Sequence, residues 1–496
     1  MNVEVAPPEA NADPKEIVEG YLQATSNYQP NYSVARQFLT RMASEKWSPE
    51  SGVTIYRGSP RAVDPDTVRL DGRQIGSLRP DRTYLAQDQE LHKNFDLVQE
   101  NGEWRINDLP GGLMVAERSF RYFYRSYDLY FIGNSVSLVP EPIYLPALNN
   151  PANVASALMK ALLNGASAWL KPAVTTALPP NTSLSVDSVT ITNGIAVVPL
   201  SDSVLALPDR QRSLLAAQIV YTLRQVGGVK GVLIKVNEQP YRVPGSDSNS
   251  MVISIDANQD MDPVPFVSGD QLYAVQNGAV KRVTATTDSL TVENLDGPLS
   301  DGTPRIDALA VSATNTDFAV TSNGRTVLSQ GSITSGELST LPLRGVRELL
   351  RPQFSRYGEI WDIGYEGNKQ QLWRISGDGE KTRTDKIDLP AIKDVKVTAF
   401  KISPDGTRIA VVRSAGTASQ LWLARITRSD KITVDGWRQL DTTQTNMPQI
   451  RRIADVAWVD ATELLVLGAP DTAISYAPYR VVEDASRITA QGNREH

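Results

Sequence analysis

Hydrophobic and polar residues alternate most regularly from Val397 to Ile426, in VTAFKISPDGTRIAVVRSAGTASQLWLARI. Residues 397–402 alternate as a first strand, Ser403–Gly406 has the composition of a tight turn, and apolar runs follow at Ile409–Val412 and Gln420–Ile426. This pattern predicts three strands of one β-propeller blade. Because one face of such a small sheet stays apolar until a neighbouring blade covers it, the pattern should repeat along the chain.

Related patterns recur through the second half of the sequence, at Gly269–Val283, Ile306–Leu328, Phe354–Ile375 and Val456–Leu467. Their spacing of roughly 40 to 50 residues is typical of propeller repeats and predicts an all-β propeller of five or more blades over residues 266–496. The residues from Ile488 on have the pattern of the beginning of another blade. Either a strand from the N-terminal side of the propeller closes the ring, or the propeller is incomplete at its end and the native chain continues. Four tryptophans at strand positions should pack between blades: Trp361, Trp373, Trp422 and Trp458.

The first third of the chain predicts an α+β domain over residues 13–125, preceded by a Pro-rich, acidic linker at residues 1–12. Asp13-Pro14 is a typical helix start, and a second helix is expected after Ser33. The apolar stripes of the two helices would be Ile17, Val18, Tyr21 and Leu22, and then Ala35, Phe38, Leu39 and Met42. A curved antiparallel sheet should follow, in short strands at Val53–Tyr56, Thr67–Leu70, Arg73–Leu78, Thr83–Gln87, Asn94–Gln99 and Trp104–Asn107. Two helices and such a sheet indicate an NTF2-like or cystatin-like domain.

Aromatic residues alternate with arginine and phenylalanine at Phe120, Tyr122 and Tyr124. The spacing would suit a platform on which bases stack, but aromatic residues at every second position are more typical of a half-buried strand, which is the interpretation we adopt.

The middle third, residues 126–240, has the rhythm of an α/β domain. Asp128–Ile132 and Ser135–Val139 predict a strand pair, Pro151 opens a helix, and Asn193-Gly194 is a strong hairpin signal. An amphipathic helix from Pro208 and a strand at Val229–Val236 complete a β-α-β-β-α-β order, which predicts helices on one face of a small sheet.

Residues 241–265 are polar and rich in turn formers, so we expect a linker between domains. Asp256, Asn258 and Asp260 match the first three ligand positions of an EF-hand-type calcium loop. The glycine position is Met261 and the bidentate glutamate position is Val267, so the linker interpretation is preferred and no metal is expected.

The amino-acid composition limits the kinds of partner, catalytic group and metal site that the chain can have. A net charge of −6 with scattered lysine and arginine argues against a nucleic-acid partner. The chain has no cysteine, which excludes thiolate nucleophiles and cysteine-ligated metal sites. Its two histidines are His92 and His496, and His92 lies in a stretch of alternating polarity where an ordinary strand residue is expected. No apolar run is long enough to span a bilayer, and the first residues lack the pattern of a signal peptide.

Four aspartates of the second half are candidate catalytic groups of an envelope hydrolase or lyase: Asp362, Asp378, Asp405 and Asp455. Such an enzyme needs two carboxylates about 5 to 10 Å apart, or a metal. Asp378 and Asp405 lie in GDG and PDG turns, so the preferred interpretation is a protein without catalytic residues or cofactor.

The segments LMKALLNGASAWLKPAVTTALPPNTSLSVDSVTITNGIAVVPLS and RSLLAAQIVYTLRQVGGVKGVLIKVNEQP resemble the GerMN domain of spore-germination proteins. Placed before a propeller carrying LLRPQFSRYGEIWDIG and VTAFKISPDGTRIAVV, they make the chain similar to the LpqB family of actinobacterial lipoproteins. The resemblance covers nearly the whole chain.

This resemblance implies an extracytoplasmic accessory lipoprotein that binds and modulates an MtrB-like sensor histidine kinase of a two-component system and so affects envelope homeostasis and division. Family members are lipidated on a cysteine, so this sequence would be an ectodomain, with residues 2–12 as the tether to the lipid anchor at the outer face of the cell membrane. Cell-wall polymer binding is the alternative function, and the partner-binding residues stay open.

Overall fold

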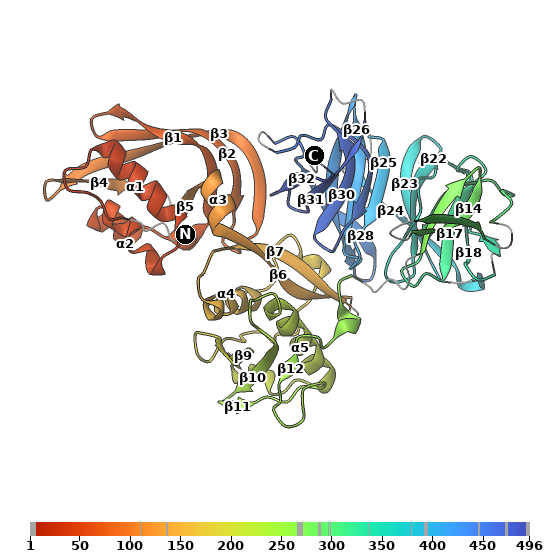
Figure 1. The fold of residues 1–496 in the computed structure, drawn as a ribbon, viewed down its shortest axis with the longest axis horizontal. Coiled ribbons are helices and arrows are strands. Elements are labelled where there is room, and N and C mark those ends of the chain that lie inside the picture. Colours follow the sequence, from red (N-terminus) through yellow and green to blue (C-terminus); the bar gives the residue numbers. More distant parts are fainter. Residues whose placement is uncertain are drawn as a thin grey trace. The chain divides into compact units, whose positions relative to one another are not determined.

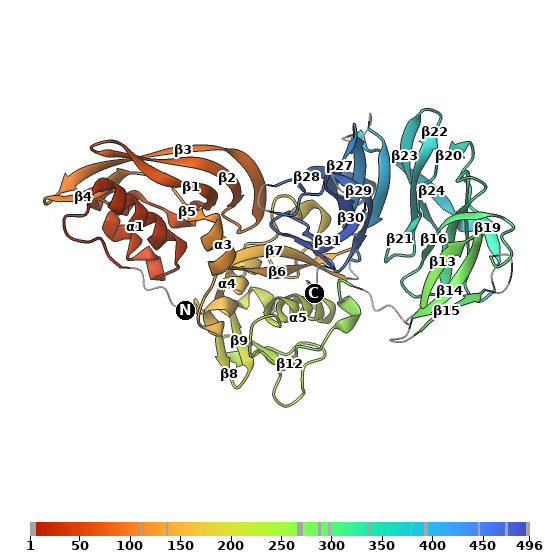
Figure 2. The same cartoon turned by 45° about the horizontal axis from the view of Figure 1, so that its top comes forward.

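The computed structural model describes residues 6–109, 111–134, 137–264, 271–285, 289–295, 297, 299–335, 337–377, 379–390, 395–444, 447–471 and 475–492. The chain divides into two compact units. The first comprises residues 1–131, 140–168 and 176–257, and the second comprises residues 132–139, 169–175 and 258–496 (Figures 1 and 2). Each unit is described by itself.

The N-terminal part of the first unit packs helices against a five-stranded sheet. Helix α1 (Pro14–Ser26) begins, as predicted, at Asp13, whose side chain accepts from the Glu16 N–H while Glu16 accepts from the Asp13 N–H. The sheet has the order β4-β3-β2-β1-β5. Its strands are β1 (Val53–Asp64), β2 (Thr67–Leu78), β3 (Tyr84–Glu100), β4 (Glu103–Asp108) and β5 (Leu113–Ala116). The predicted α+β class is confirmed, although the short strands expected from the sequence merge into longer ones.

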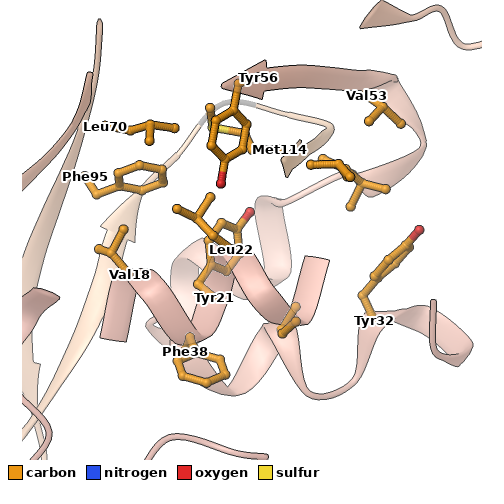
Figure 3. Packing of buried hydrophobic residues seen from close by; sticks show 14 of the residues in the cluster. Val18, Tyr21, Leu22, Tyr32, Phe38, Val53, Tyr56, Leu70, Phe95 and Met114 are labelled. Atoms are coloured by element: carbon orange, nitrogen blue, oxygen red, sulfur yellow. The ribbon is translucent and has the colours of Figure 1, made fainter. Parts of the chain in front are cut away.

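The core of this domain lies between α1 and the sheet. Figure 3 shows Tyr21 and Leu22 of α1 directed toward Tyr56 and Met114 of the sheet. Tyr21 also meets the rings of Trp47 and Phe95 edge-on, at centroid distances of 5.8 and 6.2 Å. Edge-to-face pairs of this kind add to the free energy gained from burying the rings.

The second predicted helix is wrong in detail. The chain forms a short 3₁₀ helix, η2 (Ala35–Phe38), and then α2 (Arg41–Lys46), which is capped by the Thr40 hydroxyl. Met42, expected in the core, is 55% exposed. The break at Leu39 rotates α2 relative to the preceding turn, so a single helical periodicity does not hold across it.

The aromatic segment is a second correction. Residues 117–123 form helix α3 (Glu117–Phe123), not a strand, with Phe120 buried and Tyr122 56% exposed. The strand begins only at Tyr124, the first residue of β6 (Tyr124–Gly133). Phe120 packs with Tyr84 and Tyr144, and Tyr124 is buried as well, so the segment places two rings in the core and is not a stacking platform.

The middle region contains two separate sheets. β6 pairs with β7 (Ser137–Pro146), and a second sheet has the order β11-β10-β9-β8, with β12 also on β10. Its strands are β8 (Thr190–Thr192), β9 (Ile195–Leu200), β10 (Gly231–Val236), β11 (Gln239–Pro240) and β12 (Ile253–Ser254), and its helices are α4 (Pro151–Leu163) and α5 (Asp209–Leu223). The Asn193-Gly194 hairpin is confirmed, because both residues have the positive φ of a type I′ turn.

Helix α5 is not amphipathic along its second half, because every residue from 215 to 223 is buried. The β6 strand covers it on the side away from the sheet, where the Tyr130 N–H donates to Thr222 Oγ1 at 3.2 Å. This is why β6 and β7 stay outside the sheet that the β-α-β-β-α-β order suggested. The expected linker also contributes to this unit, since β12 pairs with β10 and Val243 and Ile253 are 1% exposed.

The described residues of the second unit form five small antiparallel sheets in chain order, as in a propeller (Figure 2). Strands follow one another in sequence order except in the third sheet, whose first two strands both pair with the same neighbour. They are β13 (Gln271–Gln276), β14 (Ala279–Ala285) and β15 (Leu290–Asn294); β16 (Ile306–Val311), β17 (Asp317–Ser322), β18 (Val327–Ser332) and β19 (Leu338–Thr340); β20 (Val346–Arg347), β21 (Gln353–Phe354), β22 (Ile360–Glu366), β23 (Lys369–Ser376) and β24 (Arg383–Ile387); β25 (Val397–Ile402), β26 (Arg408–Ala415), β27 (Ala418–Arg428) and β28 (Ile432–Leu440); β29 (Arg452–Trp458), β30 (Glu463–Ala469), β31 (Ala477–Val482) and β32 (Ile488–Ala490).

The segment from Ile488 does not begin a further blade, because β32 pairs with β31 as the outer strand of the fifth sheet. Three of the four tryptophans join neighbouring blades as predicted, whereas Trp422 contacts Arg413 and Gln420 of its own blade. Trp361 packs with residues of the fourth blade and Trp373 with residues of the second, from opposite faces of the third. Trp458 of the fifth blade donates its indole N–H to the Lys401 carbonyl at 3.3 Å.

Candidate functional site in the propeller channel

The first strands of all five blades surround one cavity of about 470 Å³. These are β13, β16, β21, β25 and β29, so the cavity is the central channel of the propeller. Its polar side chains come from four blades: Asp307, Arg325, Arg351, Gln353, Thr398 and Asp455. A volume of this size is typical of small-molecule sites in proteins.

Two charged contacts organise the channel wall. Arg351 forms an ion pair with Asp455 at 3.0 Å, joining the third blade to the fifth. Asp307 Oδ2 accepts the backbone N–H of Arg325 at 2.8 Å, and this holds the turn in which Arg325 has a φ of +61°. An arginine in the left-handed region is strained, so the hydrogen bond from its backbone contributes to keeping this side chain at the channel.

Two titrating groups lie beside this wall. Burial lowers the pKa of Lys401, and the nearby Arg351 lowers it further. Burial raises the pKa of Asp362 well above its usual range, because hydrogen bonds from two backbone N–H groups and the charge of Arg325 offset the desolvation only in part. The shift favours the protonated form of Asp362, and its Oδ2 accepts no hydrogen bond from the described residues.

The aspartates considered from the sequence have different surroundings. Asp362 is fully buried, and Asp405 is fully buried in an ion pair with Arg408 at 2.8 Å. Asp455 alone among them lines the channel, and Asp378 lies outside the described residues. The turn interpretation of Asp405 is confirmed, since its Oδ1 accepts from Ser403 Oγ at 2.7 Å and from the Thr407 N–H at 2.7 Å.

The other candidate residues lie elsewhere. His92 is an exposed residue of β3, as predicted, and its Nδ1 lies 2.7 Å from Asp71 Oδ1. Hydrogen bonds from His92, Arg61 and Arg69 hold the pKa of Asp71 well below its usual range. His496, Phe266 and Val267 lie outside the described residues.

The calcium-like sequence does not form a loop of the EF-hand type. Met261 ends a 3₁₀ helix, η6 (Gln259–Met261), and its side chain is buried. No group of three or more His, Asp or Glu side chains within the described ranges is arranged to hold a metal ion. Within the same ranges, no helix has both the length and the apolar content needed to cross a bilayer.

The sequence did not single out Arg325, Arg351, Asp307 or Gln353. Asp307 and Arg325 belong to the second repeat and Arg351 and Gln353 to the third, and only the packing of the blades brings them to one cavity with residues of the other repeats. The single local signal was the propeller pattern itself, because the first strand of each repeat must border the axis.

Together the folds define a multidomain protein in which an α+β domain and an α/β domain precede a five-sheet propeller with a polar channel. Three family models match its successive parts: the N-terminal domain of lipoprotein LpqB at residues 7–121, the sporulation and spore germination domain (Germane) at residues 128–242, and the β-propeller domain of lipoprotein LpqB at residues 270–495. The chain belongs to the LpqB lipoprotein family, and the resemblance found in the sequence is confirmed.

Relatives named lipoprotein LpqB occur in several genera. The relative from Cutibacterium acnes is 27% identical over 99% of this chain and 84% of its own length. The relative from Thermobifida fusca is 23% identical over 91% of this chain and 78% of its own length. Their shared name is that of a lipoprotein and not of an enzyme.

Solved structures match parts of the chain. The first GerMN domain of the sporulation protein GerM from Bacillus subtilis is 19% identical, with a TM-score of 0.21, over 26% of this chain and 97% of that one. A putative TolB from Agrobacterium tumefaciens is 11% identical, with a TM-score of 0.33, over 46% of this chain and 77% of that one.

Proposed function

We propose that this chain is the extracytoplasmic part of a lipid-anchored accessory protein that binds the extracellular domain of an MtrB-like sensor histidine kinase. By binding one kinase state more tightly than another, it would modulate kinase output and so affect envelope homeostasis and division. The observation that carries the proposal is the match of the N-terminal domain and the propeller to LpqB lipoprotein models, with a GerMN-type domain between them. The shift of the kinase equilibrium is limited by the difference in affinity for the two states.

A surface suited to a protein partner lies on the first blade. Leu272 and Val292 both pair with Val283 of the central strand, so the three side chains share one face of the sheet. Leu290 lies two residues before Val292 and shares that face. Leu272, Leu290 and Val292 are 60%, 66% and 52% exposed. Adjacent exposed apolar side chains favour a protein contact, because covering them removes apolar surface from water. We name Leu272, Val283, Leu290 and Val292 the first-blade patch.

Interferometry between the whole chain and the purified extracellular domain of the kinase tests the proposal. We expect saturable binding that Val292→Asp weakens about tenfold or more, because a charge in the first-blade patch must be desolvated on contact. Val186→Asp is the matched control, since Val186 is 51% exposed but lies far along the chain in the first unit.

The two variants separate the outcomes. An absence of binding up to tens of micromolar would exclude a direct contact that needs no lipid. Equal binding by both variants and the wild type would retain the kinase contact and exclude the first-blade patch as its surface.

Cell-wall polymer binding is the second candidate, and the polar channel favours it. The arginine, aspartate and glutamine side chains of the channel offer many hydrogen bonds to a hydroxylated ligand. Co-sedimentation of the chain with purified cell wall tests this function, which predicts that the protein pellets in a saturable way.

A further inference from the structure

The propeller channel has the dimensions and lining of a ligand site. Its volume of about 470 Å³ is bordered by strands of all five blades and by the turn that holds Arg325. Gln353 is 3% exposed, and its Nε2 donates to the Arg351 carbonyl at 3.1 Å. The amide oxygen of Gln353 accepts no hydrogen bond from the described residues, which leaves it available to a hydroxyl group in the channel.

One cation of the lining is available to an anion. The lining carries two arginines and two aspartates, and the Arg351 guanidinium is paired with Asp455 at 3.0 Å. The Arg325 side chain is exposed at the channel, and no ion pair joins it to a carboxylate among the described residues. Asp307 Oδ2 accepts the backbone N–H of Arg325, and burial raises the pKa of the neighbouring Asp362, which disfavours its charged form.

The neutral polar groups add a second requirement. Thr398 and Gln353 lie on the lining of the fourth and third blades, and Asp455 and Asp307 offer further carboxylate oxygens. Carboxylate and amide oxygens accept hydrogen bonds from hydroxyl groups, whereas a guanidinium binds a carboxylate through two parallel N–H bonds. A ligand that satisfies both sets has several hydroxyls and one carboxylate.

We infer that the propeller channel binds a sugar acid, with the ligand carboxylate on the Arg325 guanidinium and its hydroxyls on Gln353 and the channel aspartates. This site goes beyond kinase binding and is independent of it, because no kinase takes part in the contact. A free sugar acid and the acidic end of a glycan chain share this chemistry.

Calorimetric titration of the whole chain with two matched pairs of probes tests the site. Glucuronate is compared with glucose, and N-acetylmuramate with N-acetylglucosamine, because each pair differs by a carboxylate-bearing group. We expect at least one acid to bind about tenfold or more tightly than its neutral counterpart, the difference typical of a charge-assisted hydrogen bond. Arg325→Met should remove this preference and Arg325→Lys should keep part of it.

Lys386→Met is the control, since Lys386 is an exposed residue that pairs with Glu366 outside the channel lining. It should bind like the wild type. Failure of both acids to bind better than their neutral counterparts up to about 10 mM would overturn the inference, as would an Arg325→Met variant that keeps the preference. If the acid binds but cell wall does not sediment with the protein, the ligand is a free sugar acid and the polymer function fails separately.

Discussion

The buried arginine between the fourth and fifth blades provides the sharpest test of how the propeller is held together. Arg408 is fully buried, and its Nη1 donates to Asp405 Oδ2 at 2.8 Å. Its Nε lies 2.7 Å from Oε2 of Glu483, which follows the third strand of the fifth blade and is 2% exposed. Replacing Arg408 by methionine keeps much of the side-chain volume but leaves Asp405 buried without its cation. Glu483, whose pKa burial raises to about 8, keeps only Arg438, at 4.0 Å.

The expected loss of stability follows from these contacts. Each ion pair is worth about 4 kcal/mol of attraction at an effective dielectric constant near 20, and desolvation of the charges offsets part of it. Removing one partner of a buried pair costs about 3 to 5 kcal/mol, because an uncompensated charge remains. We therefore expect Arg408→Met to lower the free energy of unfolding of the propeller by about 4 kcal/mol. Adding Glu483→Gln should restore only a small part of that loss at pH 7, because burial raises the pKa of Glu483 to about 8 and so already disfavours its charged form there.

Hydrogen exchange of the β26 and β31 amides, measured by mass spectrometry, reports the free energy of opening of this part of the chain. Lys386→Met removes an exposed ion pair in the same unit and should change this free energy by less than about 0.5 kcal/mol. A loss below about 1 kcal/mol in Arg408→Met would refute the argument that this arginine joins the two blades through desolvated charges.

Three further predictions concern stability. The pKa of Glu359 is lowered to about 2, because the hydrogen bonds and charges of Arg428 and the other partners of Glu359 outweigh the effect of burial. The wild type should therefore lose stability as pH falls from about 4.5 toward 2. Glu359→Gln should lose less stability than the wild type in urea titrations across that range. Burial raises the pKa of Asp362, so the folded state binds this proton more tightly than the unfolded state does. Wild-type stability should therefore fall as pH rises from about 4 to neutrality. The stability of Asp362→Asn should not change over this range and should exceed that of the wild type at pH 7. A Cβ at Gly72 would lie 2.1 Å from the Arg57 carbonyl oxygen in the paired strand. Gly72→Ala should therefore destabilise the N-terminal domain by about 1 to 3 kcal/mol in thermal unfolding. An unchanged midpoint temperature of unfolding would contradict that contact.

Local patterns predicted those parts of the fold that local contacts determine. The Asp13 cap, the Asn193-Gly194 hairpin and the turn at Asp405 each depend on residues within a few positions of one another. The prediction of a strand in the aromatic segment depends on the alternation of Phe120, Tyr122 and Tyr124. Phe120 and Tyr124 are buried and pack together at a centroid distance of 4.9 Å, whereas Tyr122 is exposed. A period of two cannot be distinguished from one face of a short helix over so few residues.

The channel could not be predicted, because its composition depends on which repeats meet at the axis. Arg351 and Asp455 belong to different repeats, and no spacing in the sequence indicates that they form an ion pair. Arg325 lies in a turn with Asn323-Gly324, where a sequence pattern indicates only a reversal of the chain. The site therefore forms only when the blades pack around one axis, whereas each blade forms from its local sequence.

A recurrent polar turn explains how degenerate blades still build one channel. In the second and fourth blades, a serine after the first strand accepts the backbone N–H of the residue that begins the second strand: Ser312 from Asp317 and Ser403 from Arg408. In the third blade Ser355 accepts from Tyr357 within the turn, and in the fifth blade Asp460, which lies in the turn itself, accepts from Glu463. Each contact fixes the end of a channel-lining strand whatever the rest of the blade contains. The lining is thus positioned by the scaffold before any ligand arrives, so little ordering of the protein should oppose binding.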